Sequence, residues 1–238
     1  MIKKKQERRE HVIMHDTVPF PIKEAYKAAR TNLRFMLQKH TGGKAVVFTS
    51  PLMRDGKTTT CVNMAIAFAQ AGTRVLIIDA DMRKPQVHAI MHLPMADGLT
   101  DALLDVSTLP QKIKDTQFPH LKVLTVGTIP PNPAELLLSD ALEELLRAAE
   151  ADFEYIFIDT PPIGIVTDAA IIGNKTLGAV IVSRQGITNK PALKKAVQAL
   201  EQAGARPLAH MLNGVVPSRK SYKYSGYRYR YDYKYEYK

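Results

Sequence analysis

The sequence predicts an α/β fold in which helices cover both faces of a mainly parallel sheet. Short β-rich runs alternate with longer helical runs along most of the 238 residues, as parallel strands joined by helical crossovers require. Two of the β-rich runs, 75–78 and 155–158, are apolar on both faces, which is typical of strands covered from both sides. These observations predict a three-layer sandwich with ligands bound at the carboxyl ends of the strands.

The elements are expected in the following order along the chain. An N-terminal helix over about residues 22–38 has apolar residues at helical spacing and ends at Gly42-Gly43. Strands are predicted at 45–49, 74–79, 122–126, 155–159, 177–183 and 207–212. Further helices are predicted near 57–71, 98–105, 134–150, 167–174 and 189–203.

Positive charge is concentrated at the two ends of the chain. Of the formal net charge of +10, residues 1–10 carry five basic and two acidic groups, and residues 219–238 carry seven basic and two acidic groups. We therefore expect a basic N-terminal arm over 1–21, one domain over 22–216 and a tail over 217–238. The tail contains no Leu, Ile, Val or Phe with which to bury a core, so we expect it to be flexible, with an edge strand as the alternative.

No feature of the sequence predicts a membrane span or a secretory signal. The longest apolar runs fall well short of the roughly 20 residues that cross a bilayer, and the first ten residues are charged. Cys61 is the only cysteine, which excludes an intrachain disulfide and fits a reducing compartment. The sequence therefore predicts a cytoplasmic protein.

A phosphate-binding loop is predicted between the first strand and the next helix. Residues 50–59 read Ser-Pro-Leu-Met-Arg-Asp-Gly-Lys-Thr-Thr. A strand, a tight loop and a helix N-terminus direct backbone N–H groups at one point, where the helix dipole favours an anion. Lys57 is expected to reach the β- and γ-phosphates and the Thr58 hydroxyl to bind Mg²⁺, although Pro51 stands where the general signature has glycine. The expected nucleotide contacts in this loop are Arg54, Asp55, Gly56, Lys57, Thr58 and Thr59.

Two acidic motifs end further strands of the same predicted sheet. Asp79 and Asp81 follow the apolar run 75–78, and Asp159 follows 155–158. Carboxylates at the carboxyl edge of the sheet, beside the loop, suit a hard cation, whereas helix or turn capping is the alternative for each. If Asp79 and Asp81 were both in strand geometry, they would point to the same side. One could then bind Mg²⁺ while the other accepts the proton of an attacking hydroxyl.

Taken together, these motifs resemble the bacterial tyrosine kinases (BY-kinases) of exopolysaccharide and capsule biosynthesis. The similarity is to the cytoplasmic kinase chain of systems split into two proteins. The resemblance covers residues 50–59, 79–85, 127–137 (Gly-Thr-Ile-Pro-Pro-Asn-Pro-Ala-Glu-Leu-Leu), 158–162 and the tyrosine-rich tail. It implies a P-loop NTPase-like fold. It also implies an ATP- and Mg²⁺-dependent protein-tyrosine kinase that autophosphorylates its tail in trans.

The resemblance also implies roles for individual residues. The catalytic positions are Lys57, Asp79 and Asp81, with Asp79 as the base. Metal ligands are expected at Thr58, Asp81 and Asp159, and Asn213 is expected beside the adenine. Eight of the ten tyrosines lie in the last 17 residues and are the expected autophosphorylation sites: Tyr222, Tyr224, Tyr227, Tyr229, Tyr231, Tyr233, Tyr235 and Tyr237.

The family's self-association pattern, Glu-x-x-Arg-x-x-Arg, occurs here as Glu24, Lys27 and Arg30. Lys27 keeps the charge but loses the planar fork of arginine, so a weaker subunit contact is expected. At the loop, Arg54 stands where the family has glycine, which predicts an altered conformation or nucleotide affinity. The implied partners are other copies in a ring such as an octamer, a transmembrane activator of the polysaccharide co-polymerase type that recruits the chain to the inner membrane face, and a cognate tyrosine phosphatase.

Two other functions remain open from the sequence. A positioning or partitioning ATPase of the same fold would carry a second lysine five residues before Lys57, where this chain has Leu52. A binding module could use the alternating tyrosines and basic residues of the tail on single-stranded nucleic acid or anionic lipid, although we expect no specific nucleic-acid partner. Arg83 and Lys84 could contact phosphate or substrate, or cap a turn. His88 and His92 lack a zinc-site spacing and are expected to pack or face solvent.

Overall fold

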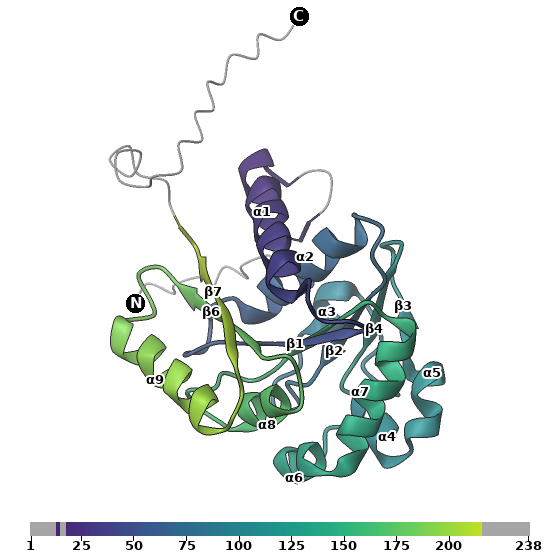
Figure 1. Cartoon of the computed structure of the whole chain (residues 1–238). Coiled ribbons are helices and arrows are strands. Elements are labelled where there is room, and N and C mark those ends of the chain that lie inside the picture. The colour runs from purple at the N-terminus through teal and green to yellow at the C-terminus, as the bar shows by residue number, and fades with distance from the viewer. Residues whose placement is uncertain (1–12, 15–17, 216–238) are drawn as a thin grey trace, which may run out of the picture.

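The computed structural model describes residues 13–14 and 18–215. This part of the chain forms a seven-stranded sheet in the order β3-β4-β2-β5-β1-β6-β7 (Figure 1). Neighbouring strands run parallel except for β3 and β4, which are antiparallel. The strands are β1 (Lys44–Thr49), β2 (Val75–Asp79), β3 (Lys114–Asp115), β4 (Leu121–Leu124), β5 (Tyr155–Asp159), β6 (Ala179–Arg184) and β7 (Pro207–Asn213).

Helices cover both faces of the sheet, which confirms the expected three-layer sandwich (Figure 1). One face is covered by α1 (Phe20–Leu37), α2 (Lys57–Ala69) and α3 (Val87–Met91). The other face is covered by α4 (Leu99–Leu104), α5 (Leu109–Lys112), α6 (Pro133–Leu138), α7 (Asp140–Asp152), α8 (Asp168–Asn174) and α9 (Lys190–Gln202), with the 3₁₀ turn η1 (Val106–Thr108) before α5. None of the described helices is both long and apolar enough to cross a membrane.

The central strands are apolar on both sides because their alternate side chains enter two different cores. In β1, Val46 and Phe48 pack with α1 and α2, whereas Ala45 and Val47 pack with the helices of the opposite face. The strands β2 and β5 divide their side chains in the same way. Burial on both faces therefore explains the unbroken apolar runs from which the parallel sheet was predicted.

Several boundaries differ from the expected ones. The strand predicted at 122–126 ends at Leu124, because the carbonyl groups of Thr125 and Val126 accept N–H groups of Leu99 and Thr100 at the start of α4. The short elements β3, α3 and α5 were not predicted. They contain between two and five residues, too few for a periodic pattern.

The helix predicted over 134–150 is two helices, α6 and α7. Ser139 separates them with an extended backbone, ψ 158°, and its hydroxyl donates to the carbonyl of Leu136 at 2.7 Å. Asp140 and Glu143 lie in the first turn of α7, where carboxylates favour a helix start. The leucines continue at helical spacing across the break, so the apolar pattern conceals it.

Part of the predicted N-terminal arm belongs to the folded domain. The helix α1 begins at Phe20 with Pro21 in its first turn, a favoured position for proline. Met14 is 2% exposed, and its N–H donates to Asn63 Oδ1 on α2 at 2.8 Å. Val18 is also buried. The tail predicted over 217–238 lies outside the described residues.

Candidate active site

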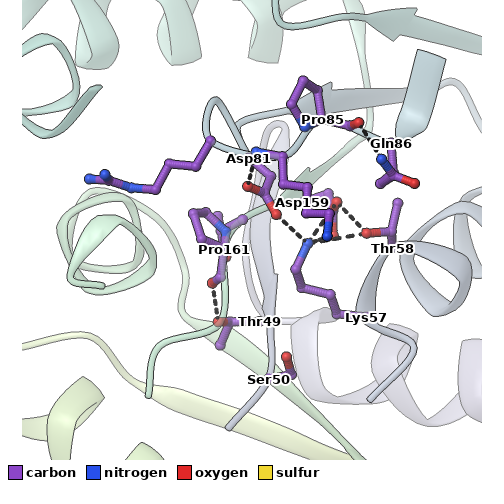
Figure 2. A network of polar contacts seen from close by, with 12 residues as sticks. Thr49, Ser50, Lys57, Thr58, Asp81, Pro85, Gln86, Asp159 and Pro161 are labelled. Carbon is purple, nitrogen blue, oxygen red and sulfur yellow. Dashed lines mark hydrogen bonds and ion pairs between the residues drawn. The ribbon is translucent and has the colours of Figure 1, made fainter. Parts of the chain in front are cut away.

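The ammonium group of Lys57 lies among oxygen atoms that come from three elements (Figure 2). Lys57, the first residue of α2, donates to Asp81 Oδ2 at 2.9 Å, to Asp159 Oδ2 at 3.2 Å and to Thr58 Oγ1 at 3.1 Å. The Thr58 hydroxyl donates in turn to Asp159 Oδ2 at 2.8 Å. All four residues are buried, and Asp159 completely so. The structure thus brings together the loop lysine and one residue of each predicted acidic motif.

The sheet topology explains why the two acidic motifs meet. The strands β2 and β5 are parallel neighbours, and Asp79 is the register partner of Asp159. The strand β1, which leads into the loop, lies on the other side of β5. Because the carboxyl ends of parallel strands meet at one edge of a sheet, the loop and both motifs converge there.

Asp79 and Asp81 have different surroundings, contrary to the shared orientation considered from their spacing. Asp79 ends β2, and its two carboxylate oxygens accept the N–H groups of Asp81, at 3.2 Å, and of Val87, at 3.0 Å. Asp81 lies beyond the strand and reaches Lys57. Strand alternation therefore does not apply to the pair. Asp79 holds the segment between β2 and α3, and Asp81 faces the amine.

Burial and mutual contact shift the pKa values of this cluster. Burial lowers the pKa of Lys57, but the charges of Asp159 and Asp81 outweigh it, so that the pKa lies above its ordinary value and the group is an ammonium. Burial and the nearby charge of Asp159 raise the pKa of Asp79 to about 8. Burial also raises the pKa of Asp159, against the opposing effect of Lys57 and Thr58.

The oxygen atoms around Lys57 fit a bound cation. Hydroxyl and carboxylate oxygens are the ligands that Mg²⁺ takes in proteins, and here they already surround a positive charge. Within residues 13–14 and 18–215, no group of three or more His, Cys, Asp or Glu side chains could hold a metal ion by itself. Mg²⁺ ordinarily relies on one or two carboxylates together with waters and substrate phosphates, so this donor set is of the right kind.

The loop before α2 is shaped for an anion. Gly56 is the N-cap of α2 with φ 91°, and it has no side chain to cap the first N–H groups of the helix. The left-handed backbone at Gly56 favours glycine, and a Cβ atom there would also lie 2.1 Å from Asn213 Nδ2, so the Asn213 side chain would have to move. Arg54 also has a positive φ, 68°, although it is not a glycine. Arg54, which stands where the family has glycine, therefore has a left-handed backbone conformation.

The side chain of Asp55 is buried and forms hydrogen bonds with other residues of the protein, so it is not exposed on the surface of the loop. Asp55 is 1% exposed, and its carboxylate accepts the N–H of Leu52 at 3.0 Å and the hydroxyl of Thr188 at 2.6 Å. Its carbonyl accepts Asn213 Nδ2 at 3.2 Å. Asn213 is the last residue of β7, one residue beyond the predicted end of that strand. Thr188 was missed because its segment carries no recognisable motif.

Arg83 forms an ion pair with Asp168, a contact that differs from the phosphate, substrate or turn-capping contacts predicted for it from the sequence. Its guanidinium donates to both carboxylate oxygens of Asp168, from Nε at 3.1 Å and from Nη2 at 3.3 Å. Asp168 lies in the first turn of α8 and is fully buried, whereas the Arg83 side chain is 44% exposed. The N–H of Lys84 donates to Asp81 Oδ1 at 3.0 Å and closes a turn. The only sequence signal for Asp168 was an acid at a helix start.

The remaining predicted site residues are placed as follows. On α1, Lys27 forms an ion pair with Glu24 at 2.8 Å, and Arg30 Nη1 donates to the carbonyl of Ala67 at 2.6 Å. These contacts lie within one chain and leave the predicted subunit contact untested. Thr59 is half-buried in the first turn of α2. The eight predicted phosphorylation sites, Tyr222 to Tyr237, lie outside the described residues.

The sequence and the structure of this chain are both similar to those of known proteins. A family model described as an AAA domain matches residues 55–198, more than half of the chain. Tyrosine-protein kinase YwqD of Bacillus subtilis is 43% identical over 206 residues, which are 87% of this chain and 85% of that protein. The kinase domain of Escherichia coli tyrosine kinase ETK has a TM-score of 0.79 at 30% identity, covering 99% of this chain and 92% of that chain. The chimerical protein CapA2B2 has a TM-score of 0.77 at 38% identity, covering 83% and 86%.

Proposed function

Because this chain belongs to the bacterial tyrosine-protein kinases, we propose that it transfers the γ-phosphoryl group of ATP to tyrosines of its own C-terminal tail. One observation carries the proposal. The Lys57 ammonium, the Thr58 hydroxyl and the carboxylates of Asp81 and Asp159 meet at the carboxyl edge of the sheet. The same chain ends in 17 residues that contain eight tyrosines.

Each residue type at the site has a function in this reaction. Mg²⁺-ATP supplies the transferable phosphoryl group and the charge that must be neutralised. Thr58, Asp81 and Asp159 would hold the metal. The Lys57 ammonium and the N-terminus of α2 would bind the phosphates, and Asn213 would lie beside the adenine. Since phosphoryl transfer depends mainly on positioning and charge neutralisation, these groups suffice for most of the catalysis.

We assign the base to Asp79. The Asp79 carboxylate accepts the backbone N–H of Asp81, and Asp79 is the register partner of Asp159 on the neighbouring strand β5. In the structure Asp79 is buried, both its carboxylate oxygens accept backbone N–H groups, and its pKa of about 8 keeps it protonated at neutral pH. To accept the proton of an attacking tyrosine hydroxyl, this carboxyl group would have to turn towards the site and ionise when Mg²⁺-ATP binds. Asp79→Asn should then reduce kcat without changing the Mg²⁺ requirement, whereas Asp81→Asn should raise the Mg²⁺ concentration needed for half-maximal activity.

Transfer between copies is the proposed arrangement. Glu24, Lys27 and Arg30 on α1 would contribute to a ring in which one copy presents its tail to the next. The exposed apolar side chains of Phe35 and Met36 on the same helix, 63% and 48% exposed, support a contact surface there. Octamers are one size that such a ring could have.

The proposed cellular role is control of exopolysaccharide or capsule synthesis. A transmembrane activator of the polysaccharide co-polymerase type would recruit the kinase from the cytoplasm to the inner face of the membrane and promote nucleotide binding. A cognate tyrosine phosphatase would reverse the modification. The similarity in fold to CapA2B2, a chimerical protein, supports a search for such a partner.

An ATPase without kinase activity is the alternative. The presence of Leu52 in place of a second signature lysine, and the tyrosine-rich tail, both favour the kinase. Incubation with labelled ATP separates the two: the kinase leaves label on tyrosine, and the ATPase releases all of it as free phosphate.

Lys57→Met tests the assignment of the site. The variant loses the charge that contacts the phosphates, so we expect no phosphotyrosine in its tail after incubation with Mg²⁺-ATP, as measured by mass spectrometry. Circular dichroism should show an unchanged fold, because methionine fills a similar volume. The variant should nevertheless be less stable, because the buried carboxylates of Asp81 and Asp159 lose their cation. Phosphotyrosine in the purified variant at the wild-type level would refute the assignment.

A further inference from the structure

A groove on the carboxyl side of the sheet is not part of the site described above. It lies between α4, the segment 128–132 and α6, and its volume is about 610 Å³. We call it the α4–α6 groove. Leu104, Ile129 and Pro131 contribute apolar walls, and Asp101 and Glu135 contribute carboxylates, while no cationic side chain lines it. Its lining includes much of the 127–137 motif, to which the phosphate site assigns no role.

We propose that the α4–α6 groove binds the tyrosine tail, residues 217–238, and so selects which tyrosine reaches the phosphate site. This inference rests on the proposed phosphorylation of the tail and adds the surface that recognises it. The groove would hold one tyrosine ring against its apolar walls while its carboxylates attract the neighbouring lysines and arginines of the tail.

Charge complementarity supports this occupant. The tail has seven basic and two acidic residues, a net charge of +5, and from Tyr227 onward every second residue is a tyrosine. The groove offers two carboxylates next to exposed apolar side chains, with Leu104 77% and Ile129 51% exposed. A chain that alternates aromatic rings with cations matches such a surface better than a wholly apolar or acidic peptide does.

An unsatisfied polar atom in the groove wall also indicates a ligand. Thr100 is 6% exposed, and its Oγ1 has no hydrogen-bond partner within the described part of the chain. Buried hydroxyl groups in proteins are almost always paired, because an unpaired one is desolvated without compensation. This hydroxyl oxygen is itself inaccessible to solvent, so a polar group of a bound tail could pair with it only after a small movement of the groove wall.

The position of the groove suits a tail that also reaches Lys57. The segment 128–132 follows β4, and β4 is the direct neighbour of β2, whose end carries Asp79 and leads to Asp81. Adjacent strands are about 4.8 Å apart, and an extended peptide advances about 6.6 Å for every two residues. If one tyrosine of the tail is bound in the groove, the next tyrosines along the tail, two or four residues away, would extend from it and could approach the phosphate site. A shift of the tail along the groove by two residues would then bring the next tyrosine to the phosphate site.

The length of the tail permits this binding. The tail begins after β7, five positions from β4 in the sheet, a distance of about 24 Å at the usual strand spacing. The 13 residue-to-residue steps from Gly214 to Tyr227 can extend over about 43 Å. The groove is thus within reach of the chain's own tail, and in the ring proposed above a neighbour's tail would take this place.

The test is steady-state phosphorylation of a synthetic peptide of residues 222–238 by the full-length chain, with the peptide varied at saturating ATP and, separately, ATP varied at a fixed peptide concentration. Glu135→Lys reverses an exposed charge in the groove, and we expect it to raise the KM for the peptide about fivefold, with unchanged kcat and unchanged KM for ATP. Glu201→Lys is the matched control. It reverses an exposed acid on α9, which packs against β6 and β7 at the opposite edge of the sheet from β4, and should leave all three constants unchanged.

Two further measurements make the result specific. Ile129→Ser should also raise the KM for the peptide, because it removes an apolar wall. A peptide whose lysines and arginines are replaced by glutamate should bind poorly to the wild type and be partly rescued by Glu135→Lys. Equal peptide KM values for Glu135→Lys and Glu201→Lys, with both variants melting like the wild type, would overturn the inference. Failure of the wild type to phosphorylate the peptide at all would instead overturn the proposed function.

Discussion

The charges at the active site are stabilised mainly by one another. Lys57 and Asp159 are buried, and removal of one partner from a buried ion pair costs far more than the pair contributes to stability. The cluster therefore preserves a cation-binding arrangement of oxygens at some cost in stability. A site that must hold Mg²⁺ and phosphates during part of its cycle has a reason to accept this cost, because binding supplies the compensating charges.

Asp79 should make the stability of the nucleotide-free protein depend on pH. Its pKa is about 8 when folded and near 3.8 when unfolded, so the unfolded chain releases its proton first as the pH rises. The contribution to the free energy of unfolding is complete below about pH 4 and is lost as the pH rises through 8. Asp79→Asn should remove this dependence and make the slope between pH 5 and pH 8 less negative, by at most about 1.4 kcal/mol per pH unit.

Urea unfolding without Mg²⁺ or nucleotide measures this slope. The asparagine also changes two backbone hydrogen bonds, but that cost is the same at every pH and shifts only the level of the curve. Parallel curves for the wild type and Asp79→Asn would contradict the raised pKa.

Arg54→Gly should relax the phosphate loop. A residue with a Cβ atom pays about 1–2 kcal/mol to adopt the left-handed backbone found at φ 68°, and glycine does not. Part of this gain is lost to the greater freedom of glycine in the unfolded chain, so we expect the free energy of unfolding to rise by up to about 1 kcal/mol. Arg54→Ala is the control for the lost charge, since alanine keeps the strain. An equal effect of both variants would exclude the backbone explanation.

Among the elements, the segment after β2 is tied to α8 through one ion pair. Arg83 donates two hydrogen bonds to Asp168, which is fully buried at the start of the helix. The same segment carries Asp81. The ion pair therefore connects the segment of a candidate metal ligand to helix α8. Sequence periodicity predicted the elements on both sides of this contact but not the contact itself.

Loss of this pair should destabilise the protein measurably. Arg83→Ala leaves a buried carboxylate without its cation, and we expect a loss of about 2 kcal/mol, reduced from the cost of a fully buried pair because Arg83 is partly exposed. Lys84→Ala removes an exposed neighbour and should change the stability by less than about 0.5 kcal/mol. A double-mutant cycle with Asp168→Ala should give a coupling of about 1–2 kcal/mol, and a coupling near zero would show that the pair contributes nothing.

For the whole molecule, the distribution of charge predicts a self-limiting assembly. The domain over residues 11–218 is nearly neutral, with +2, and the last 20 residues carry +5. Each phosphotyrosine adds about −1.5 to −2, so three of them cancel the positive charge of the tail and further ones reverse it. A reversed tail would be repelled by the acidic sites of a neighbouring copy.

Sedimentation velocity tests this expectation. The phosphorylated chain should sediment more slowly than the same sample after phosphatase treatment, because repulsion of the tails would dissociate the ring. Phosphatase should have no effect on the sedimentation of Lys57→Met, which has no phosphate to lose. Identical sedimentation of the two wild-type samples would contradict a role of tail charge in assembly.

Local patterns by themselves determined the class of the fold and the chemical nature of the site. Apolar runs such as 155–158 are visible wherever a strand is buried on both faces, and a glycine-lysine-threonine loop after a strand indicates phosphate because backbone geometry and charge act over a few residues. Only the tertiary structure showed that Asp79 and Asp81 have different surroundings. It alone joined Asp55 to Thr188 and Arg83 to Asp168, pairs that lie 133 and 85 residues apart. Such contacts depend on strand order and on how loops pack at the sheet edge, and neither is encoded in the periodicity of a short segment.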